Sequence, residues 1–157
     1  PIPDGARSLI LLHGTASSTR GSFSKLWLRQ PKQWARLRAE FGDHIYALEH
    51  WSLTRSPVDN ALTLARIMPR KGAVCLLSHS RGGLIGELLC LDPAGVDRPG
   101  ITAILGSAGE TDAAANAARA KQEQRLLELL HEIESRPELE IERFVRVACP
   151  GGYFGPS

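Results

Sequence analysis

The chain has 157 residues, of which 43% are hydrophobic and 23% charged, and this composition predicts one domain with a sizeable core. It excludes collagen, low-complexity disorder and a miniprotein held together by disulfides. The 19 Lys and Arg residues nearly balance the 17 Asp and Glu residues, which gives a formal net charge of +2. Because the basic residues are scattered along the chain, we expect no nucleic-acid partner.

The apolar stretches and the cysteines set expectations for the compartment. No stretch approaches the roughly 18–20 consecutive apolar residues of a membrane span, so we expect no transmembrane segment. Cys75, Cys90 and Cys149 each lie inside an apolar run, and their spacing fits neither a zinc site nor a CxxC redox pair. We expect reduced, buried thiols in a cytoplasmic protein that holds no metal and no cofactor.

Short apolar runs alternate with helical patterns, an order that is typical of an α/β fold with a parallel sheet and crossover helices. The apolar runs predict strands over residues 8–12, 44–48, 73–77 and 144–149. Helical spacing predicts helices over residues 34–41, 57–68, 84–91 and 112–135. Ser56 and Asp59 form a capping box around Pro57 at the start of the second helix. Residues 95–109 are predicted to be a loop with one apolar patch.

The sequence SHSRGG, residues 78–83, connects a predicted buried strand to a predicted apolar helix. This context is what a nucleophile elbow of the form G-x-S-x-G requires, with Ser80 as the nucleophile. Ser78 stands where the first glycine would be, and Gly82 and Gly83 keep the helix side of the turn small. The alternative is an ordinary Ser-Gly turn that caps a helix.

A second turn follows the strand predicted over residues 8–12. His13, Gly14 and Thr15 form this turn, and the backbone N–H of Thr15 can supply half of an oxyanion hole. The N–H of Arg81, the residue after the predicted nucleophile, is the other half. Taken alone, the His-Gly turn is an ordinary strand end; together with the elbow it indicates a hydrolase site.

With these motifs the sequence resembles the α/β-hydrolase superfamily, in its lipase and esterase branch. The segments that carry the resemblance are LILLHGT, HIYALEH, SPVDNAL, VCLLSHSRGGL and RFVRVACP, in this order. Within the branch, the HGTASST loop and the SHSRGG turn are most similar to a group of bacterial lipase-like domains. The resemblance implies a parallel-sheet hydrolase core with Ser80 as nucleophile, the backbones of Thr15 and Arg81 as oxyanion donors, and His79 as an elbow residue rather than the base.

The resemblance also implies a substrate class and a lid. The substrate would be a small-molecule or lipid acyl ester, and the chemistry needs no cofactor. A helical lid-like insertion is expected at about residues 95–140, where the predicted helix 112–135 carries Leu126, Leu129, Leu130 and Ile133 on one face. This face either covers the site or packs against the core.

The acid and the histidine of a catalytic triad are missing from their usual places. In this superfamily both follow the nucleophile, after later strands. Downstream of Ser80 only His131 is available, on a helix, where a solvated surface residue is the better interpretation. His13, His44 and His50 lie at strand ends before the elbow, where structural hydrogen bonding is expected. The downstream carboxylates Asp92, Asp97 and Asp112 do not follow a fourth strand.

Two hypotheses follow from the missing residues. In the first, residues 1–157 are a single partial hydrolase domain that lacks the C-terminal strands and has low activity or none by itself. Such a domain would expose a sheet edge through which chains can associate. In the second, the chain is a non-catalytic α/β scaffold that binds a partner or an acyl ligand. The absence of a Walker lysine and of G-x-G-x-x-G argues against a nucleotide site.

Overall fold

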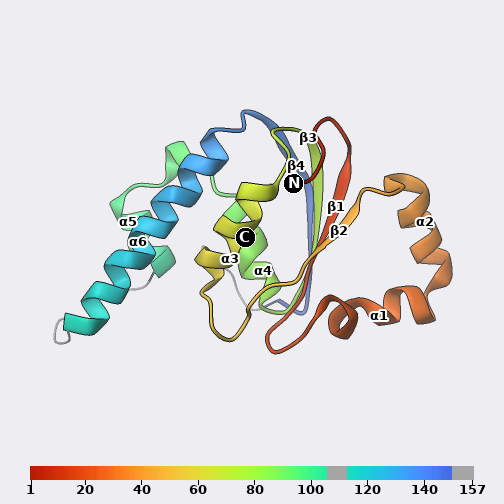
Figure 1. Ribbon diagram of the computed structural model, residues 1–157, viewed down its shortest axis with the longest axis horizontal. Helices are drawn as coiled ribbons and strands as arrows, with labels where there is room; N and C mark the ends of the chain where they lie inside the picture. The colour runs from red at the N-terminus through yellow and green to blue at the C-terminus, as the bar shows by residue number, and fades with distance from the viewer. Residues whose placement is uncertain (106–112, 150–157) are drawn as a thin grey trace.

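A four-stranded, fully parallel sheet forms the centre of the molecule, with the strand order β2-β1-β3-β4 (Figure 1). The computed structural model describes residues 1–105 and 113–149. The strands are β1 (Ser8–Leu12), β2 (Ile45–Leu48), β3 (Lys71–His79) and β4 (Glu138–Val147). Helices cover both faces of this sheet, so the predicted α/β fold class is confirmed.

The helices divide between the two faces of the sheet (Figure 1). On one face lie α1 (Thr19–Arg29) and α2 (Pro31–Phe41). On the other lie α3 (Pro57–Ile67), α4 (Gly82–Leu89), α5 (Arg98–Leu105) and α6 (Ala113–Glu134), with the short 3₁₀ turn η1 (Pro93–Gly95) between α4 and α5.

Strand β1 is buried along its whole length, as its continuous apolar run predicts. Ile10 and Leu12 pack into the larger core, beneath α3 to α6, whereas Leu9 and Leu11 pack into the smaller core, beneath α1 and α2. The alternation follows from the two-residue period of a strand. A central strand with apolar side chains on both faces therefore joins the two helical layers.

The start of α3 has the predicted capping box. Ser56 Oγ accepts the N–H of Asp59 at 3.0 Å, and the Asp59 carboxylate accepts the N–H of Ser56 at 3.4 Å. Pro57 occupies the first turn, where its missing N–H costs no hydrogen bond. These local contacts define where α3 begins.

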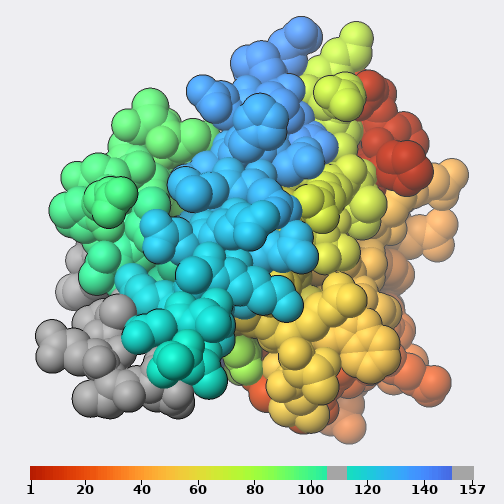
Figure 2. All heavy atoms as spheres, turned by 60° about the vertical axis from the view of Figure 1, so that its left-hand side comes forward, coloured from red at the N-terminus to blue at the C-terminus, as the bar shows by residue number. Residues whose placement is uncertain are grey.

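Helix α6 crosses the front of the molecule in Figure 2, with α5 to one side. Leu126 and Leu129 are fully buried, and α6 contacts α3 and α5. Gln122 ties α6 to the first turn of α3, since its side-chain oxygen accepts the hydroxyl of Ser56 at 2.7 Å. Of the two roles left open for the leucine-rich face, packing against the core is the one observed.

Several sequence predictions of local structure are corrected. The loop expected over residues 95–109 contains α5, and α1 was not predicted at all. Strand β4 begins at Glu138 and ends at Val147, rather than spanning 144–149, because it pairs with the whole of β3 from Lys71 onward. All three cysteines are free, and Cys75 is buried. Cys90, however, which directly follows α4, is exposed, and Cys149 is only half-buried.

The outer strands β2 and β4 are the two edges of the sheet in the described residues. Strand β4 is the more open of the two, with Val145 43% and Val147 46% exposed. Association through such an edge remains a prediction. No helix in the described part of the chain is long and apolar enough to cross a membrane.

Candidate functional site

The candidate site lies at the carboxyl end of the two central strands. From β1 the chain crosses to β2 on one side, and β3 then returns to the other side of β1. Ligands of open parallel sheets bind where the strand order reverses in this way, because the loops that follow the two strands diverge there. Leu12 of β1 pairs with Ser78 of β3, so the turns after both strands lie next to each other.

Ser80 occupies a strained turn between β3 and α4. Its φ angle is +52°, in the left-handed region that costs a residue with a Cβ about 1–2 kcal/mol. The turn is held at both of its ends: Ser80 N–H donates to the carbonyl of Val147 at 2.9 Å, and Gly83 N–H donates to the carbonyl of Ser80 at 3.0 Å. The strand, turn and helix that a nucleophile elbow requires are therefore present.

Small residues let the neighbouring segments approach Ser80 closely. A Cβ on Gly14 would lie 3.0 Å from the Cβ of Ser80 and 3.3 Å from Nδ1 of His79. A Cβ on Gly82 would lie 2.3 Å from the carbonyl oxygen of Leu12, a distance that no real side chain allows. The turn after β1, the elbow and the start of α4 are thus in backbone contact.

The other two elbow positions are also sterically restricted. Ser78 is fully buried; its Oγ donates to the carbonyl of Val145 at 3.4 Å and lies 3.3 Å from Sγ of Cys149. A Cβ on Gly83 would lie 2.5 Å from the same sulfur atom. Serine at the first elbow position is therefore accommodated, and it holds the end of β4 through its hydroxyl.

His13 sets the orientation of the turn after β1. Its side chain is only 1% exposed; Nε2 accepts the N–H of His50 at 3.2 Å, which leaves Nδ1–H to donate to the carbonyl of Gly14 at 2.9 Å. The C=O and the N–H of one trans peptide point in opposite directions, so the N–H of Thr15 points away from the His13 ring. No described residue accepts a hydrogen bond from the N–H of Thr15 or Arg81.

The loop after β2 completes the candidate site. The rings of His13 and His50 stack with centroids 3.9 Å apart. Burial lowers the pKa of His50, and the neighbouring His13 and Arg81 lower it further. Ser52 connects the loops: its Oγ accepts the N–H of Ala16 at 2.9 Å, and its carbonyl accepts Nη1 of Arg81 at 3.2 Å.

Glu49, next to His50, is turned toward the start of α1. Its carboxylate accepts the N–H of Thr19 at 2.9 Å and lies 3.5 Å from Nε2 of His13. Burial, the largest single influence, raises the pKa of Glu49, but hydrogen bonding from Thr19 and the nearby His13 and His50 together outweigh it, so the pKa is lowered. Glu49 is therefore a structural acceptor at this loop and is engaged away from Arg81.

A family model described as a domain of unknown function (DUF7379) matches residues 2–152. The chain belongs to this family. No curated protein and no solved structure matches it. The family description names no activity, so the chemistry of this member has to be inferred from its residues.

The structure does not bring the remaining candidates to Ser80 as partners. His131 is exposed on α6, and the side chains of Asp92 and Asp97 accept backbone N–H groups near η1 and α5. His44 contacts Tyr46 on β2, and Asp112 lies outside the described residues. Over residues 1–105 and 113–149, Ser80 Oγ has no hydrogen-bond partner, and no group of three His, Cys, Asp or Glu side chains is placed to hold a metal.

Sequence reasoning missed Ser52 and Glu49 as parts of this region. Neither residue belongs to a motif, and each acts through contacts with segments that are distant in sequence. Only the crossing of the loops after β1, β2 and β3 brings them together. The sequence pattern carries no signal for that crossing.

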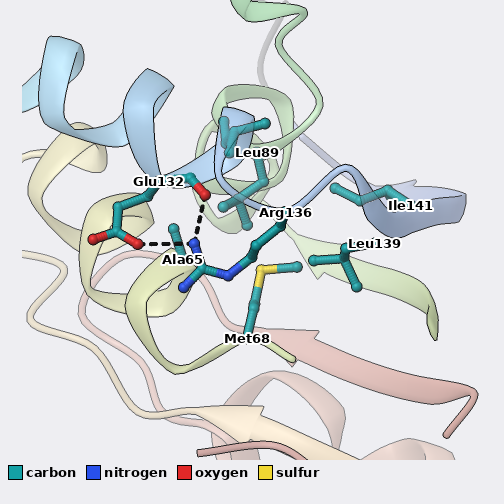
Figure 3. A pocket seen from close by; sticks show the side chains of 8 residues that line it. Ala65, Met68, Leu89, Glu132, Arg136, Leu139 and Ile141 are labelled. Carbon is teal, nitrogen blue, oxygen red and sulfur yellow. Dashed lines mark hydrogen bonds and ion pairs between the residues drawn. The ribbon is translucent and has the colours of Figure 1, made fainter. Parts of the chain in front are cut away.

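A small cavity lies at the opposite, amino end of the strands (Figure 3). Its volume is about 60 Å³, and apolar side chains such as Met68, Leu139 and Ile141 form most of its wall. The guanidinium of Arg136 enters the wall and is paired with Glu132 at 2.8 Å. The cavity has no nucleophile and is separate from the Ser80 turn.

Proposed function

We propose that this domain is a serine hydrolase of the lipase or esterase type that forms an acyl-enzyme on Ser80. The observation that carries the proposal is the left-handed Ser80 between β3 and α4, with Gly14 against its Cβ. Backbone strain of this kind is concentrated at functional sites, and a serine gains nothing from it structurally. The resemblance of the HGT and SHSRGG motifs to the lipase and esterase branch gives independent support.

The proposed reaction is an acyl transfer. Ser80 Oγ attacks the ester carbonyl, the bond from the carbonyl carbon to the alcohol oxygen breaks, and the proton from Ser80 leaves with the alcohol. The N–H groups of Thr15 and Arg81 stabilise the oxyanion, aided by the amino end of α4. Water then hydrolyses the acyl-enzyme.

Among the described residues, no base is in contact with Ser80 to take its proton. Removal of one triad member typically leaves only the contribution of the oxyanion hole and of binding, roughly 10³–10⁴ over water. We therefore expect slow turnover of acyl esters by these residues, together with stoichiometric reaction with a strongly activated phosphonate. The free cysteines fit a reducing, cytoplasmic compartment.

The test is covalent labelling of the purified chain by a fluorophosphonate, read as intact mass. We expect a single adduct on the wild type and none on Ser80→Ala. Ser24→Ala, on α1, is the matched control and keeps the adduct. A folded wild type that forms no adduct would overturn catalysis on Ser80 by this chain, and would leave two hypotheses: a partial hydrolase domain without activity of its own, and the non-catalytic scaffold that binds a partner or an acyl ligand.

A further inference from the structure

The side chain of Arg81 is fixed beside the nucleophile. Arg81 follows Ser80 directly, and its Nη1 donates to the carbonyl of Ser52 at 3.2 Å. Ser52 is itself buried and held by the N–H of Ala16, so the acceptor cannot move freely. The guanidinium therefore lies between the elbow and the loop after β2, at the carboxyl end of the central strands.

The charge of this guanidinium is not neutralised by the described part of the chain. No carboxylate there lies within 4.0 Å of Arg81. Three other arginines that are at least partly buried are ion-paired: Arg7 with Glu40 and Glu142, Arg125 with Glu128, and Arg136 with Glu132. Glu49, the carboxylate of the neighbouring loop, is engaged by Thr19 and His13 instead.

The described residues also leave most donors of Arg81 without an acceptor. A guanidinium has five N–H donors, arranged to bind the two oxygens of a carboxylate side by side, and the Ser52 carbonyl uses one of them. The charge of Arg81 contributes, after burial and His13, to the lowered pKa of His50. A cation next to the proposed nucleophile, with open donors and no counter-charge among the described residues, is suited to an anionic group of a ligand.

The loop that holds Arg81 adds an apolar surface to this cation. Trp51 and Leu53, on either side of Ser52, are 66% and 73% exposed. Large apolar side chains at such exposure offer contact area to an aliphatic chain. The same short loop thus presents a backbone acceptor for Arg81 and two apolar side chains to solvent.

Building on the proposed function, we infer that the Ser80 site takes esters of aliphatic dicarboxylic acids and that Arg81 binds their free carboxylate. The ester carbonyl lies at Ser80 Oγ, the chain runs along the loop of Trp51 and Leu53, and the ionised end pairs with the guanidinium. Arg81 is then a specificity-determining residue through its side chain, in addition to the oxyanion role proposed for its N–H.

The first arm of the test measures acylation of Ser80 by two matched esters. Mono-p-nitrophenyl adipate carries the free carboxylate, and p-nitrophenyl methyl adipate has it blocked. Intact mass follows the acyl-enzyme, and the ratio of the two rates is taken within each variant. We expect the carboxylate ester to react about tenfold faster in the wild type, and the ratio to fall to about one in Arg81→Gln. Arg55→Gln, an exposed arginine of the same loop region, keeps the wild-type ratio.

The second arm measures binding without reaction, in Ser80→Ala. Monomethyl adipate is expected to shift the Arg81 side-chain resonance, and dimethyl adipate is not. Binding without acylation by either ester would keep the anion site and overturn the hydrolase proposal. Equal acylation by both esters, with no selective shift, would keep the hydrolase and overturn the role of Arg81. Failure of both arms would overturn both proposals.

Discussion

The two ends of the parallel sheet differ in which residue types have a left-handed backbone conformation. At the amino end, the positive φ angles belong to glycines: Gly5 before β1, Gly42 before β2 and Gly72, the second residue of β3. At the carboxyl end, within the described residues, they belong to Ala16, Ser80 and Ala148, which follow β1, β3 and β4. Glycine adopts this conformation at little cost, whereas a residue with a Cβ is strained. The chain therefore keeps its backbone strain at the end of the sheet where Ser80 lies.

The two ends of the sheet also differ in how tightly they are packed. At the carboxyl end, Gly82 brings α4 against the backbone of β1 with no space for a side chain. At the amino end, long side chains such as Met68 and Arg136 surround a cavity (Figure 3). Rigid backbone contacts place groups accurately, whereas a cavity lined by long side chains can adjust. The segments around Ser80 are therefore held in place more closely than the side chains around the cavity.

The largest effect is expected from adding one methyl group at the carboxyl end. Gly82→Ala places a Cβ 2.3 Å from the backbone oxygen of Leu12, so α4 has to move, and we expect a loss of about 3 kcal/mol in the free energy of unfolding. Ala65→Val, in the wall of the amino-end cavity, is the comparison and should change the free energy by less than about 1 kcal/mol. Urea denaturation measures both free energies of unfolding. Equal losses in the two variants would show that the carboxyl end is no more tightly packed than the amino end.

A smaller effect on stability is expected when backbone strain is removed at Ser80 or introduced at Gly42. Ser80→Gly removes the left-handed strain and should stabilise the fold by about 1 kcal/mol relative to Ser80→Ala, which keeps it. Gly42→Ala is the reverse experiment: its Cβ would meet open space, yet the φ of +57° should cost about 1 kcal/mol. Thermal or urea unfolding reads both changes. Strain at Ser80 is refuted if the glycine variant is no more stable than the alanine variant.

The smallest effect concerns pH. The pKa of His50 lies below its ordinary value of 6.5 because the ring is partly buried and lies near His13 and Arg81. The folded state thus binds this proton less readily than the unfolded chain, so stability is full above about pH 6.5 and falls as the pH drops through the folded value. Because the ring is partly exposed, solvent screens these interactions, and we expect the loss to be smaller than the effects of the substitutions above. Urea midpoints between pH 7.5 and 5 measure it.

The contributions of the two ends to the pH dependence of stability can be distinguished. His50→Gln should flatten the slope below pH 6.5. At the amino end, the hydrogen bond from Arg136 lowers the pKa of Glu132 below its ordinary 4.5, so this contribution is lost only at more acidic pH. A slope that survives in His50→Gln would show that another group is responsible.

Local sequence signals were sufficient for much of the fold and for the tight turn between β3 and α4. The run at β1, the capping box of α3 and the SHSRGG turn each depend on neighbours within a few residues, and all three are found. Helix α5 was missed because Pro99 and Gly100 stand at its start, although Pro is tolerated in a first helical turn.

The contacts between loops had no comparable signal in the sequence. His13 was expected to form structural hydrogen bonds, but its partners, the N–H of His50 and the carbonyl of Gly14, depend on where the turn after β1 and the loop after β2 meet. Helix α1 was missed for a related reason, since Phe23 is its only buried residue. An apolar stripe that narrow does not stand out from a polar loop.

The strand order also determines when the site can form during synthesis. Strand β1 is made first, and β2, its next partner in the sequence, occupies one of its edges. The other edge stays open until β3 leaves the ribosome and inserts beside it. Contacts between distant segments form slowly, and an open central edge invites wrong pairing in the meantime. The newly made chain thus completes the Ser80 turn late, and it needs protection most before that turn exists.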